Sequence, residues 1–344
     1  MNPFKLRETA LALVADDKGL LAMDESTSTA NKRFAAAGIP QNEEARRAYR
    51  DLIVSTSGLG ECLNGAILVD ETIRQQTRNG TSFSKALEQL GIIPGIKVDA
   101  GAKPMATHPG EKLTSGLDGL RERLNEYAQF GARFAKWRAV ITIGNGIPSS
   151  SCIKANALLL ALYAALCQEA GLVPIVEPEV LMEGDHDLER CAKVTETTLH
   201  AVFHELVNQR VFLEGMILKP NMVVPGLGAA RQSSNEEIAE TTVQTLLRTV
   251  PAAVPGIAFL SGGQSGEQAC TRLSAMNSRY QGRLPWALTY SFARAIQQPA
   301  MDIWHGEDAN VPAAQKALLH RARGARAARQ GKYTPSMENS LEKQ

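Results

Sequence analysis

The sequence is poor in the residues that build disulfide frameworks and metal sites. Its five cysteines stand apart without any C-x-x-C pair, and an odd count argues against a set of disulfides. Among the six histidines, only His200 and His204 have the i, i+4 spacing of a helix face, and no H-E-x-x-H motif contains them. Residues 184–188, G-D-H-D-L, look metal-like, but an aspartate there is better placed to cap the predicted helix that follows. We therefore expect reduced thiols, no metal and no cofactor.

A charge bias and long apolar runs are missing as well. The chain has 37 basic and 36 acidic residues, a net charge of +1, so it has no overall attraction to nucleic acid or to an anionic membrane. No apolar stretch reaches the ~18 residues of a membrane span. The start of the chain, M-N-P-F-K-L-R-E-T-A, lacks the apolar core of a signal peptide. We expect a cytoplasmic protein that binds neither nucleic acid nor membrane.

Short apolar runs alternate with helix-like segments along most of the 344 residues. The runs predicted as strands are 19–23, 65–69, 95–99, 134–140, 173–179, a run ending at Lys219, 257–260 and 286–290. The segments predicted as helices are 43–54, 117–129, 151–170, 188–208, 235–249 and 266–277. Such alternation, repeated about eight times, is what a closed (β/α)8 (TIM) barrel requires. An open doubly wound sheet would carry a glycine-rich fingerprint after its first strand, and G-L-L-A-M-D-E-S-T has none.

The two ends of the chain lie outside this alternation. We predict a single α/β barrel domain over residues 1–336, with an outer helix within residues 1–18, and a flexible tail over 337–344. Residues 314–329 are helix-prone and basic, and the polar segment from 331 onward is predicted to be flexible. The basic helix could be an anion or nucleic-acid patch. A solvated helix face is favoured, because no aromatic residues lie between its arginines.

Residues 211–221, V-F-L-E-G-M-I-L-K-P-N, place a lysine at the end of a buried strand. Pro220 lacks an N–H and favours extended backbone before it, so Lys219 is expected to be the last residue of that strand. A lysine there either reaches to water or lies desolvated beside another cation, and a neutral amine can then form a Schiff base. Lys136 is the candidate neighbour. Two cations about 5 Å apart repel by ~3 kcal/mol at an effective dielectric constant near 20, which equals roughly two pKa units for one of the pair.

Ionisable residues are concentrated where the predicted strands end, and those ends form one face of a parallel barrel. Side chains two residues apart on a strand point the same way, which pairs Lys136 with Arg138 and Glu177 with Glu179. The strand-end residues are Asp24, Lys97, Lys136, Arg138, Glu177, Glu179 and Lys219. Salt bridges that close the barrel would explain any one pair. The whole group is better explained by a catalytic cavity.

A phosphate site is predicted beside this group. The segment S-G-G-Q-S follows the seventh predicted strand, and Ser291 and Arg294 follow the eighth. Loops at these two places hold phosphate in many TIM barrels. The candidate residues are Ser261, Gly262, Gly263, Ser291 and Arg294. A second cationic group, Lys32-Arg33 with Arg46 and Arg47, could meet another part of the ligand or could be an exposed helix face.

Several motifs resemble class I fructose-bisphosphate aldolase, in the same order from about residue 5 to residue 336. They are D-E-S-T (24–27), G-I-K-V-D (95–99), F-A-K-W-R (134–138), P-I-V-E-P-E (174–179), G-D-H-D-L (184–188), L-K-P-N-M (218–222), F-L-S-G-G-Q-S (259–265), W-A-L-T-Y-S-F-A-R-A (286–295) and Q-G-K-Y-T-P-S (330–336). The resemblance implies reversible cleavage of fructose 1,6-bisphosphate into dihydroxyacetone phosphate and glyceraldehyde 3-phosphate. It also implies a homotetramer.

The resemblance assigns a role to each catalytic candidate. Lys219 would form the Schiff base with the ketose, and the protonated imine would act as an electron sink, so that the C3–C4 bond can break without a metal. Glu177 would be the general acid and base, with Glu179 holding it in place. Asp24 would take the C4 hydroxyl proton, with Lys136 supporting charge nearby.

The resemblance also assigns the substrate-binding candidates. Lys97 and Arg138 would bind substrate hydroxyls or the 6-phosphate. Ser261, Gly262, Ser291 and Arg294, together with Arg33, would hold the 1-phosphate. Arg46 matches a family position linked to substrate binding.

The sequence departs from the family pattern in two places. Family members commonly end in a tyrosine that folds over the site and helps to exchange the C3 proton, whereas this sequence ends L-E-K-Q and its last tyrosine is Tyr333. We therefore expect slower release of the enamine-bound triose, or water as the proton carrier. In addition, Ser28-Thr29 stands where glycine-serine is usual, which would change the 1-phosphate contacts only slightly.

Two other functions stay open. One is a Schiff-base aldolase for a different phosphorylated ketose, which the two-ended cationic site disfavours. The other is a non-catalytic sugar-phosphate-binding scaffold, which would have no need of a buried nucleophilic amine.

Overall fold

Eight parallel strands close into a barrel, in the order β1-β10-β9-β8-β7-β6-β3-β2. The computed structural model describes residues 2–338. The barrel strands are β1 (Gly19–Ala22), β2 (Leu63–Leu68), β3 (Ile93–Lys97), β6 (Phe134–Ile141), β7 (Val173–Val180), β8 (Ile217–Leu218), β9 (Gly256–Phe259) and β10 (Ala287–Phe292). Each corresponds to a predicted strand, so the TIM-barrel prediction is confirmed.

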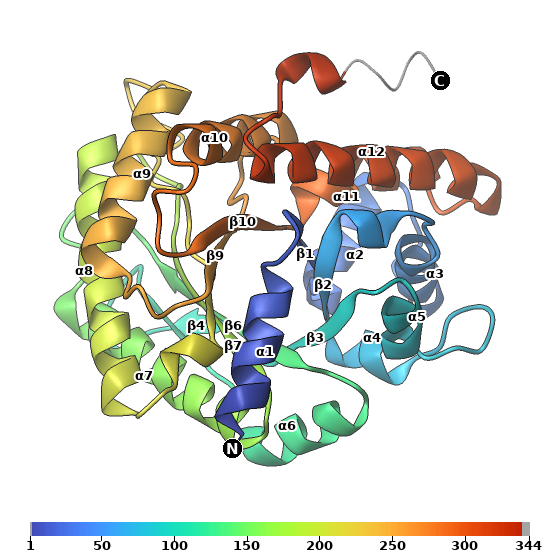
Figure 1. Ribbon diagram of the computed structural model, residues 1–344, viewed down its shortest axis with the longest axis horizontal. Helices are drawn as coiled ribbons and strands as arrows, with labels where there is room; N and C mark the ends of the chain where they lie inside the picture. The colour runs from blue at the N-terminus through green and yellow to red at the C-terminus, as the bar shows by residue number, and fades with distance from the viewer. Residues whose placement is uncertain (1, 339–344) are drawn as a thin grey trace.

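Helices surround the barrel (Figure 1). Those that join or follow the strands are α2 (Thr27–Ala36), α3 (Glu43–Val54), α4 (Asp70–Arg74), α5 (Phe83–Gln89), α6 (Leu120–Gln129), α7 (Ser150–Glu169), α8 (Leu188–Asn208), α9 (Asn235–Thr249), α10 (Gly266–Arg279), α11 (Arg294–Trp304) and α12 (Val311–Arg329). Short 3-10 turns span Leu59–Glu61, Leu213–Gly215 and Asp308–Asn310. The predicted helices are present, whereas α2, α4, α5, α11 and the antiparallel hairpin of β4 (Ala102–Pro104) and β5 (Lys112–Thr114) were not predicted.

Side-chain caps fix where several of these helices begin. The Asp187 carboxylate accepts a hydrogen bond from the Arg190 N–H at 2.8 Å, which confirms that the G-D-H-D-L segment caps α8. Ser234 and Ser265 open capping boxes at the starts of α9 and α10. The second of these boxes fixes the loop that joins β9 to α10.

The first helix, α1 (Pro3–Leu13), closes the barrel at the end where the strands begin. Its apolar side chains Leu6 and Leu13 belong to the same buried cluster as the strand residues Leu20, Ile175 and Ile217. The predicted outer helix therefore exists, but it plugs the barrel instead of joining the outer ring. The reason is that its buried face matches the apolar lower half of the barrel interior.

Helix α7 is long and apolar enough to cross a membrane by length and composition, with a mean hydropathy of 1.5. The expectation that no stretch meets this requirement is wrong for α7. In the structure α7 packs against β6, β7 and α8, and half of its most apolar window is buried. Its Tyr163 stacks on Trp137 of β6 with ring centroids 5.5 Å apart. The apolar character of α7 is thus explained by its place in the barrel wall.

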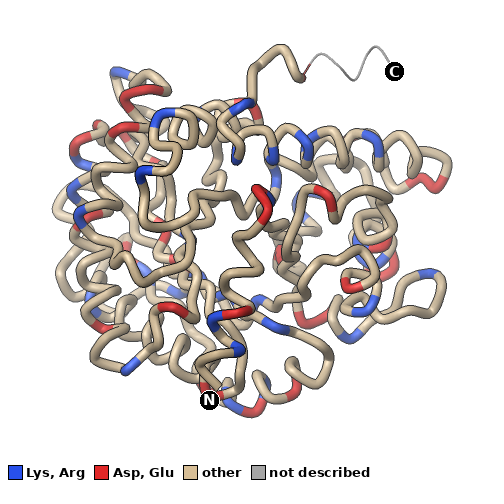
Figure 2. The backbone as a smooth tube through the Cα atoms, viewed as in Figure 1, with Lys and Arg blue, Asp and Glu red and all other residues tan. Residues whose placement is uncertain are grey.

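The end of the described chain folds back onto α12, along which Lys and Arg recur (Figure 2). Arg321 is 5% exposed and forms an ion pair with Glu338, which also accepts a hydrogen bond from the hydroxyl of the buried Tyr333. The prediction of a solvated arginine face is therefore wrong for Arg321. Residues 331–338, predicted to be flexible, are held by these contacts. Residues 339–344 of the predicted tail lie outside the described residues, and the domain boundary at 336 stays a prediction.

Candidate active site

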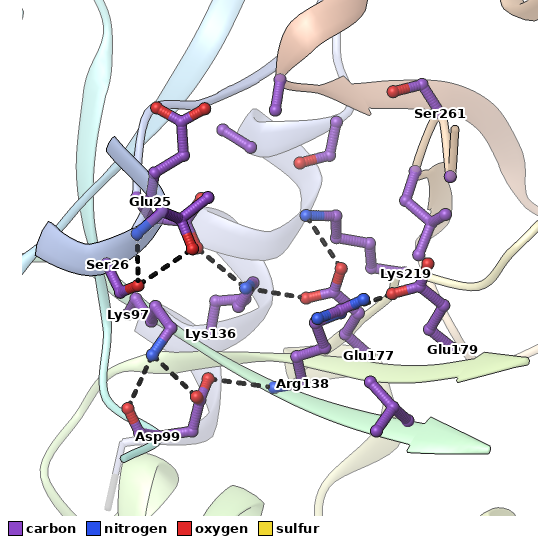
Figure 3. A pocket seen from close by; sticks show the side chains of 18 of the residues that line it. Glu25, Ser26, Lys97, Asp99, Lys136, Arg138, Glu177, Glu179, Lys219 and Ser261 are labelled. Carbon is purple, nitrogen blue, oxygen red and sulfur yellow. Dashed lines mark hydrogen bonds and ion pairs between the residues drawn. The ribbon is translucent and has the colours of Figure 1, made fainter. Parts of the chain in front are cut away.

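A cavity of about 320 Å³ opens where the barrel strands end. Its lining includes most of the predicted site residues: Asp24, Lys97, Lys136, Arg138, Glu177, Glu179, Lys219, Ser261, Gly262, Ser291 and Arg294. It also includes residues that were not predicted, among them Glu25, Ser26 and Asp99. Residues from almost every strand end thus converge on one space (Figure 3).

Strand geometry explains why the charged groups meet above an apolar layer. Lys136 lies two residues beyond Phe134 on β6, and Glu177 lies two residues beyond Ile175 on β7, so each pair points to the same side. Lys219 stands in the same relation to Ile217 of β8, and its N–H donates to the Val176 carbonyl at 2.8 Å. The apolar members of these pairs fill the lower barrel with α1. The charged members therefore form the next layer up.

Four of these groups form one continuous chain of ion pairs. The Lys219 Nζ lies 3.2 Å from Glu177 Oε1, and Glu177 Oε2 lies 3.0 Å from the Lys136 Nζ. The Lys136 Nζ also lies 2.8 Å from Asp24 Oδ2. All four residues are buried. Figure 3 shows Lys136, Glu177 and Lys219 in this order, joined by dashed lines.

The chain of ion pairs sets the charge of two of its members. Burial alone would raise the pKa of Asp24, but the positive charges of Lys136 and Lys219 lower it to about 2. Burial alone would lower the pKa of Lys136, but the carboxylates of Asp24 and Glu177 raise it well above the usual lysine range. We expected one of the lysines Lys136 and Lys219 to lose proton affinity through mutual repulsion. For Lys136 the opposite holds, because two carboxylates lie within hydrogen-bond distance.

A second set of ion pairs lies beside the first. Lys97 Nζ lies 2.7 Å from Asp99 Oδ1, and the other oxygen of Asp99 accepts from the Arg138 N–H at 3.2 Å. Arg138 forms an ion pair with Glu179. Burial raises the pKa of Glu179, although the charge of Arg138 opposes this shift. Glu179 thus contacts Arg138, and its predicted role in holding Glu177 stays a prediction.

The loop after β9, the end of β10 and the start of α11 carry polar groups suited to an oxyanion. Gly262 adopts a left-handed φ of 46°, and a Cβ there would lie 2.7 Å from the Leu260 side chain, so the turn favours glycine. Ser291 is 1% exposed, and its Oγ has no hydrogen-bond partner among the described residues. Arg294 begins α11, a helix N-terminus that adds positive potential. An anion in the cavity would satisfy these donors.

Comparison with known proteins agrees with this geometry. The family model for class-I fructose-bisphosphate aldolase matches residues 5–344. The chain belongs to the class I fructose-bisphosphate aldolase family. It is 56% identical over 334 residues to a probable class 1 fructose-bisphosphate aldolase from Xanthomonas campestris pv. campestris, covering 97% of this chain and 99% of that protein.

Two further relatives extend the family comparison. The chain is 48% identical over 333 residues to the cytosolic fructose-bisphosphate aldolase 4 of Arabidopsis thaliana, covering 97% of this chain and 84% of the relative. A co-crystal structure of fructose-bisphosphate aldolase from Plasmodium falciparum, in complex with TRAP and a small-molecule inhibitor, superposes with a TM-score of 0.95. That protein is 46% identical, and the match covers 96% of each chain.

Three predicted substrate-binding residues do not line the aldolase cavity. Arg33 forms an ion pair with Glu25 and donates to the Gln298 side chain at 2.9 Å. The guanidinium of Arg46 donates hydrogen bonds to both carboxylate oxygens of Glu71, at 2.8 and 2.6 Å. Gly263 lines an adjoining cavity of about 610 Å³, which shares Arg294 with the first. The binding roles of these residues stay predictions.

The residues missed by the sequence analysis lie next to residues that it found. Glu25 and Ser26 directly follow Asp24 in the D-E-S-T motif. Asp99 is the last residue of the G-I-K-V-D run, so the strand-end rule that selected Asp24 would also have selected Asp99. Thr29 is a different case, because the family resemblance had already linked Ser28-Thr29 to the 1-phosphate contacts, and Thr29 does line the cavity.

Proposed function

We propose that this chain cleaves fructose 1,6-bisphosphate reversibly into dihydroxyacetone phosphate and glyceraldehyde 3-phosphate through a Schiff base at Lys219, as a step of glycolysis and gluconeogenesis. The observation that carries the proposal is the buried chain of ion pairs from Lys219 through Glu177 and Lys136 to Asp24. Family membership over nearly the whole chain supports the same reaction.

The first half of the reaction needs proton transfer next to Lys219. In its neutral form the Lys219 Nζ attacks the C2 carbonyl carbon of the open-chain sugar and forms a carbinolamine. Glu177, 3.2 Å away, is within reach to protonate the departing hydroxyl, which leaves as water and yields the protonated imine. The Lys136 ammonium on the other oxygen of Glu177 balances the charge of the buried carboxylate.

The second half of the reaction breaks the C3–C4 bond. Asp24 is ionised at neutral pH, because its pKa is lowered to about 2 by Lys136 and Lys219 in spite of burial. It can therefore accept the C4 hydroxyl proton while the bonding electrons move into the imine and form an enamine. Glyceraldehyde 3-phosphate leaves first. Protonation of the enamine at C3 and hydrolysis of the imine then release dihydroxyacetone phosphate and restore the Lys219 amine.

The two phosphates of the substrate fit the two ends of the cavity. In this proposal Ser261, Gly262, Ser291 and Arg294 hold the 1-phosphate, and Lys97 and Arg138 bind substrate hydroxyls or the 6-phosphate; all six line the cavity. Arg33 and Arg46 would join them only by leaving Glu25 and Glu71. A phosphate dianion is a stronger partner for a guanidinium than one carboxylate is, so this exchange is feasible on binding.

Replacing Lys219 tests the proposed activity. We expect Lys219→Met to lower kcat for fructose 1,6-bisphosphate cleavage by at least roughly 1,000-fold, because the substitution removes the amine that we propose forms the covalent intermediate. The measurement is triose phosphate release in a coupled assay, with fructose 1-phosphate as a second substrate. Lys154→Met, on the exposed surface of α7, is the matched control and should keep full activity. An active Lys219→Met variant, or loss of wild-type turnover on adding a chelator, would contradict the proposal.

We also propose that the chain works as a cytoplasmic homotetramer. Relatives named as cytosolic support the location. The tetrameric state is carried over from the family resemblance. Sedimentation equilibrium at micromolar concentration should give four times the 37.1 kDa chain mass. A monomer at that concentration would contradict the proposed assembly.

A further inference from the structure

Arg272 on α10 is a buried cation without an acidic partner. It is 8% exposed, and none of the ion pairs among residues 2–338 includes it. Its hydrogen bonds go to two neutral amides: Nε donates to Asn235 Oδ1 at 3.1 Å, and one terminal nitrogen donates to Gln264 Oε1 at 2.7 Å. Burial lowers the pKa of Arg272, and no nearby carboxylate opposes the shift. Other buried arginines in this fold, such as Arg321, have a carboxylate in contact.

An unpaired cation at this place is unfavourable for the protein alone. Desolvating a charge is costly unless an opposite charge compensates for it. Arg272 lies in the first half of α10, and Asn235 is the first residue of α9, so Arg272 lies near the positive ends of two helices. Leucine or methionine would fill the position without this cost. A compensating anion is therefore expected from outside the described chain.

Gln264 connects Arg272 to the phosphate end of the cavity. Gln264 belongs to the loop between β9 and α10, and its N–H donates to the Ser261 carbonyl at 2.9 Å. Ser261 and Gly262 of the same loop line the cavity. The Gln264 side chain thus connects the guanidinium of Arg272 to the loop that we propose holds the 1-phosphate. Because Arg272, Gln264 and Ser261 are each 8% exposed, solvent screens this charge only weakly.

We propose that Arg272 strengthens binding of the substrate's 1-phosphate through its uncompensated charge, without touching the phosphate. This inference rests on the proposed function for the identity of the sugar, but it requires only that an oxyanion binds at the Ser261–Gly262 loop. A neutral Gln264 is part of the arrangement, because it holds the guanidinium without cancelling its charge.

Three variants separate charge from positioning. Arg272→Met removes both the charge and the contact with Gln264. Gln264→Glu keeps the contact and cancels the charge by making an ion pair. Arg272→Lys keeps the charge and loses the fork of donors. If the charge is the cause, KM for fructose 1,6-bisphosphate rises at least fivefold in Arg272→Met and in Gln264→Glu. In Arg272→Lys, KM stays within twofold of the wild-type value. The kcat changes by less than twofold in all three variants.

If Arg272 only holds Gln264 in position, the three variants will rank differently in KM. Gln264→Glu would then behave like the wild type, and Arg272→Lys like Arg272→Met, and that result would overturn the proposal. The same order must appear in the dissociation constant of inorganic phosphate, measured by calorimetry on the full chain. This second readout does not depend on catalysis, so the phosphate series still tests Arg272 if the chain proves not to cleave the bisphosphate. Equal phosphate affinity in wild type, Arg272→Met and Gln264→Glu would also overturn it.

Discussion

At the scale of single residues, Lys136 controls the electrostatics of the site. Its ammonium lies between Asp24 and Glu177, at 2.8 and 3.0 Å, and it is buried with both of them. Without it, two carboxylates would face each other with only Lys219 to balance them. Lys136 therefore compensates the charge of both acids. This suits the proposed reaction, in which Glu177 exchanges protons next to Lys219 and ionised Asp24 acts as the base.

The lowered pKa of Asp24 predicts a specific dependence of stability on pH. A carboxylate whose pKa falls to about 2 on folding stabilises the protein above its unfolded pKa, near 4, and this stabilisation disappears as the pH falls through about 2. Asp24→Asn lacks this contribution. The difference in unfolding free energy between wild type and variant should therefore shrink by about 2 kcal/mol between pH 5 and pH 2.

Urea denaturation at a series of pH values measures this difference, as far down as the folded state persists. The exposed Asp118 offers the matched control, since Asp118→Asn changes the same functional group without a buried partner. Parallel stability curves for the wild type and Asp24→Asn would show that Asp24 is not coupled to the lysines in the folded protein.

The sequence was informative about which residues face the cavity and uninformative about which pairs they form. The end of a predicted strand can be located in the sequence, so Asp24, Glu177 and Lys219 could be selected by their positions at strand ends. The partner of a long side chain depends on distant parts of the chain. Arg33 and Arg46 are predicted to bind the ligand from the family resemblance, and the sequence does not show that Glu25 and Glu71 pair with them in the folded chain.

At the scale of elements, the loop after β9 must keep its left-handed turn to present its donors. Gly262→Ala should lower the unfolding free energy by about 1 kcal/mol through backbone strain. It should also raise KM for the bisphosphate several-fold, because Gly262 lines the cavity and its N–H would move. Denaturation curves and steady-state kinetics on the same preparation give both quantities.

Gly171, between α7 and β7, provides the control for this prediction. It has a left-handed φ of 78°, and an added Cβ would meet nothing within 4 Å. Gly171→Ala should therefore cost similar stability and leave KM unchanged. If both variants raise KM alike, the effect of Gly262→Ala arises from general destabilisation and not from the loop geometry.

Elements with strong periodicity or clear boundaries were predicted well from the sequence. The two-residue strand β8 was found because Pro220 marks its end, and α3, α8 and α9 begin and end as predicted. The hairpin of β4 and β5 was missed, because its strands are only three residues long and largely exposed, so they show no apolar run. Helix α11 was missed because Pro299 lies inside it, and α2 because its sequence T-S-T-A-N-K-R-F-A-A is mostly polar.

At the scale of the whole molecule, the barrel divides into a dry lower half and a charged upper half. Helix α1 packs its apolar side chains against the lower half, and the ion pairs line the cavity that opens where the strands end. Such a site strengthens electrostatic interactions and keeps a reactive imine away from bulk solvent. The position of α1 could not be derived from its sequence. An apolar stripe predicts that one face of a helix is buried, but it does not predict which other element that face packs against.

The most direct test of the account is chemical capture of the covalent intermediate. The full chain is incubated with dihydroxyacetone phosphate, reduced with borohydride, digested and mapped by mass spectrometry. We predict one added triose phosphate on the peptide that contains Lys219, and none in Lys219→Met. A label on Lys136 or Lys97, or no label at all, would contradict the assignment of Lys219 as the Schiff-base lysine.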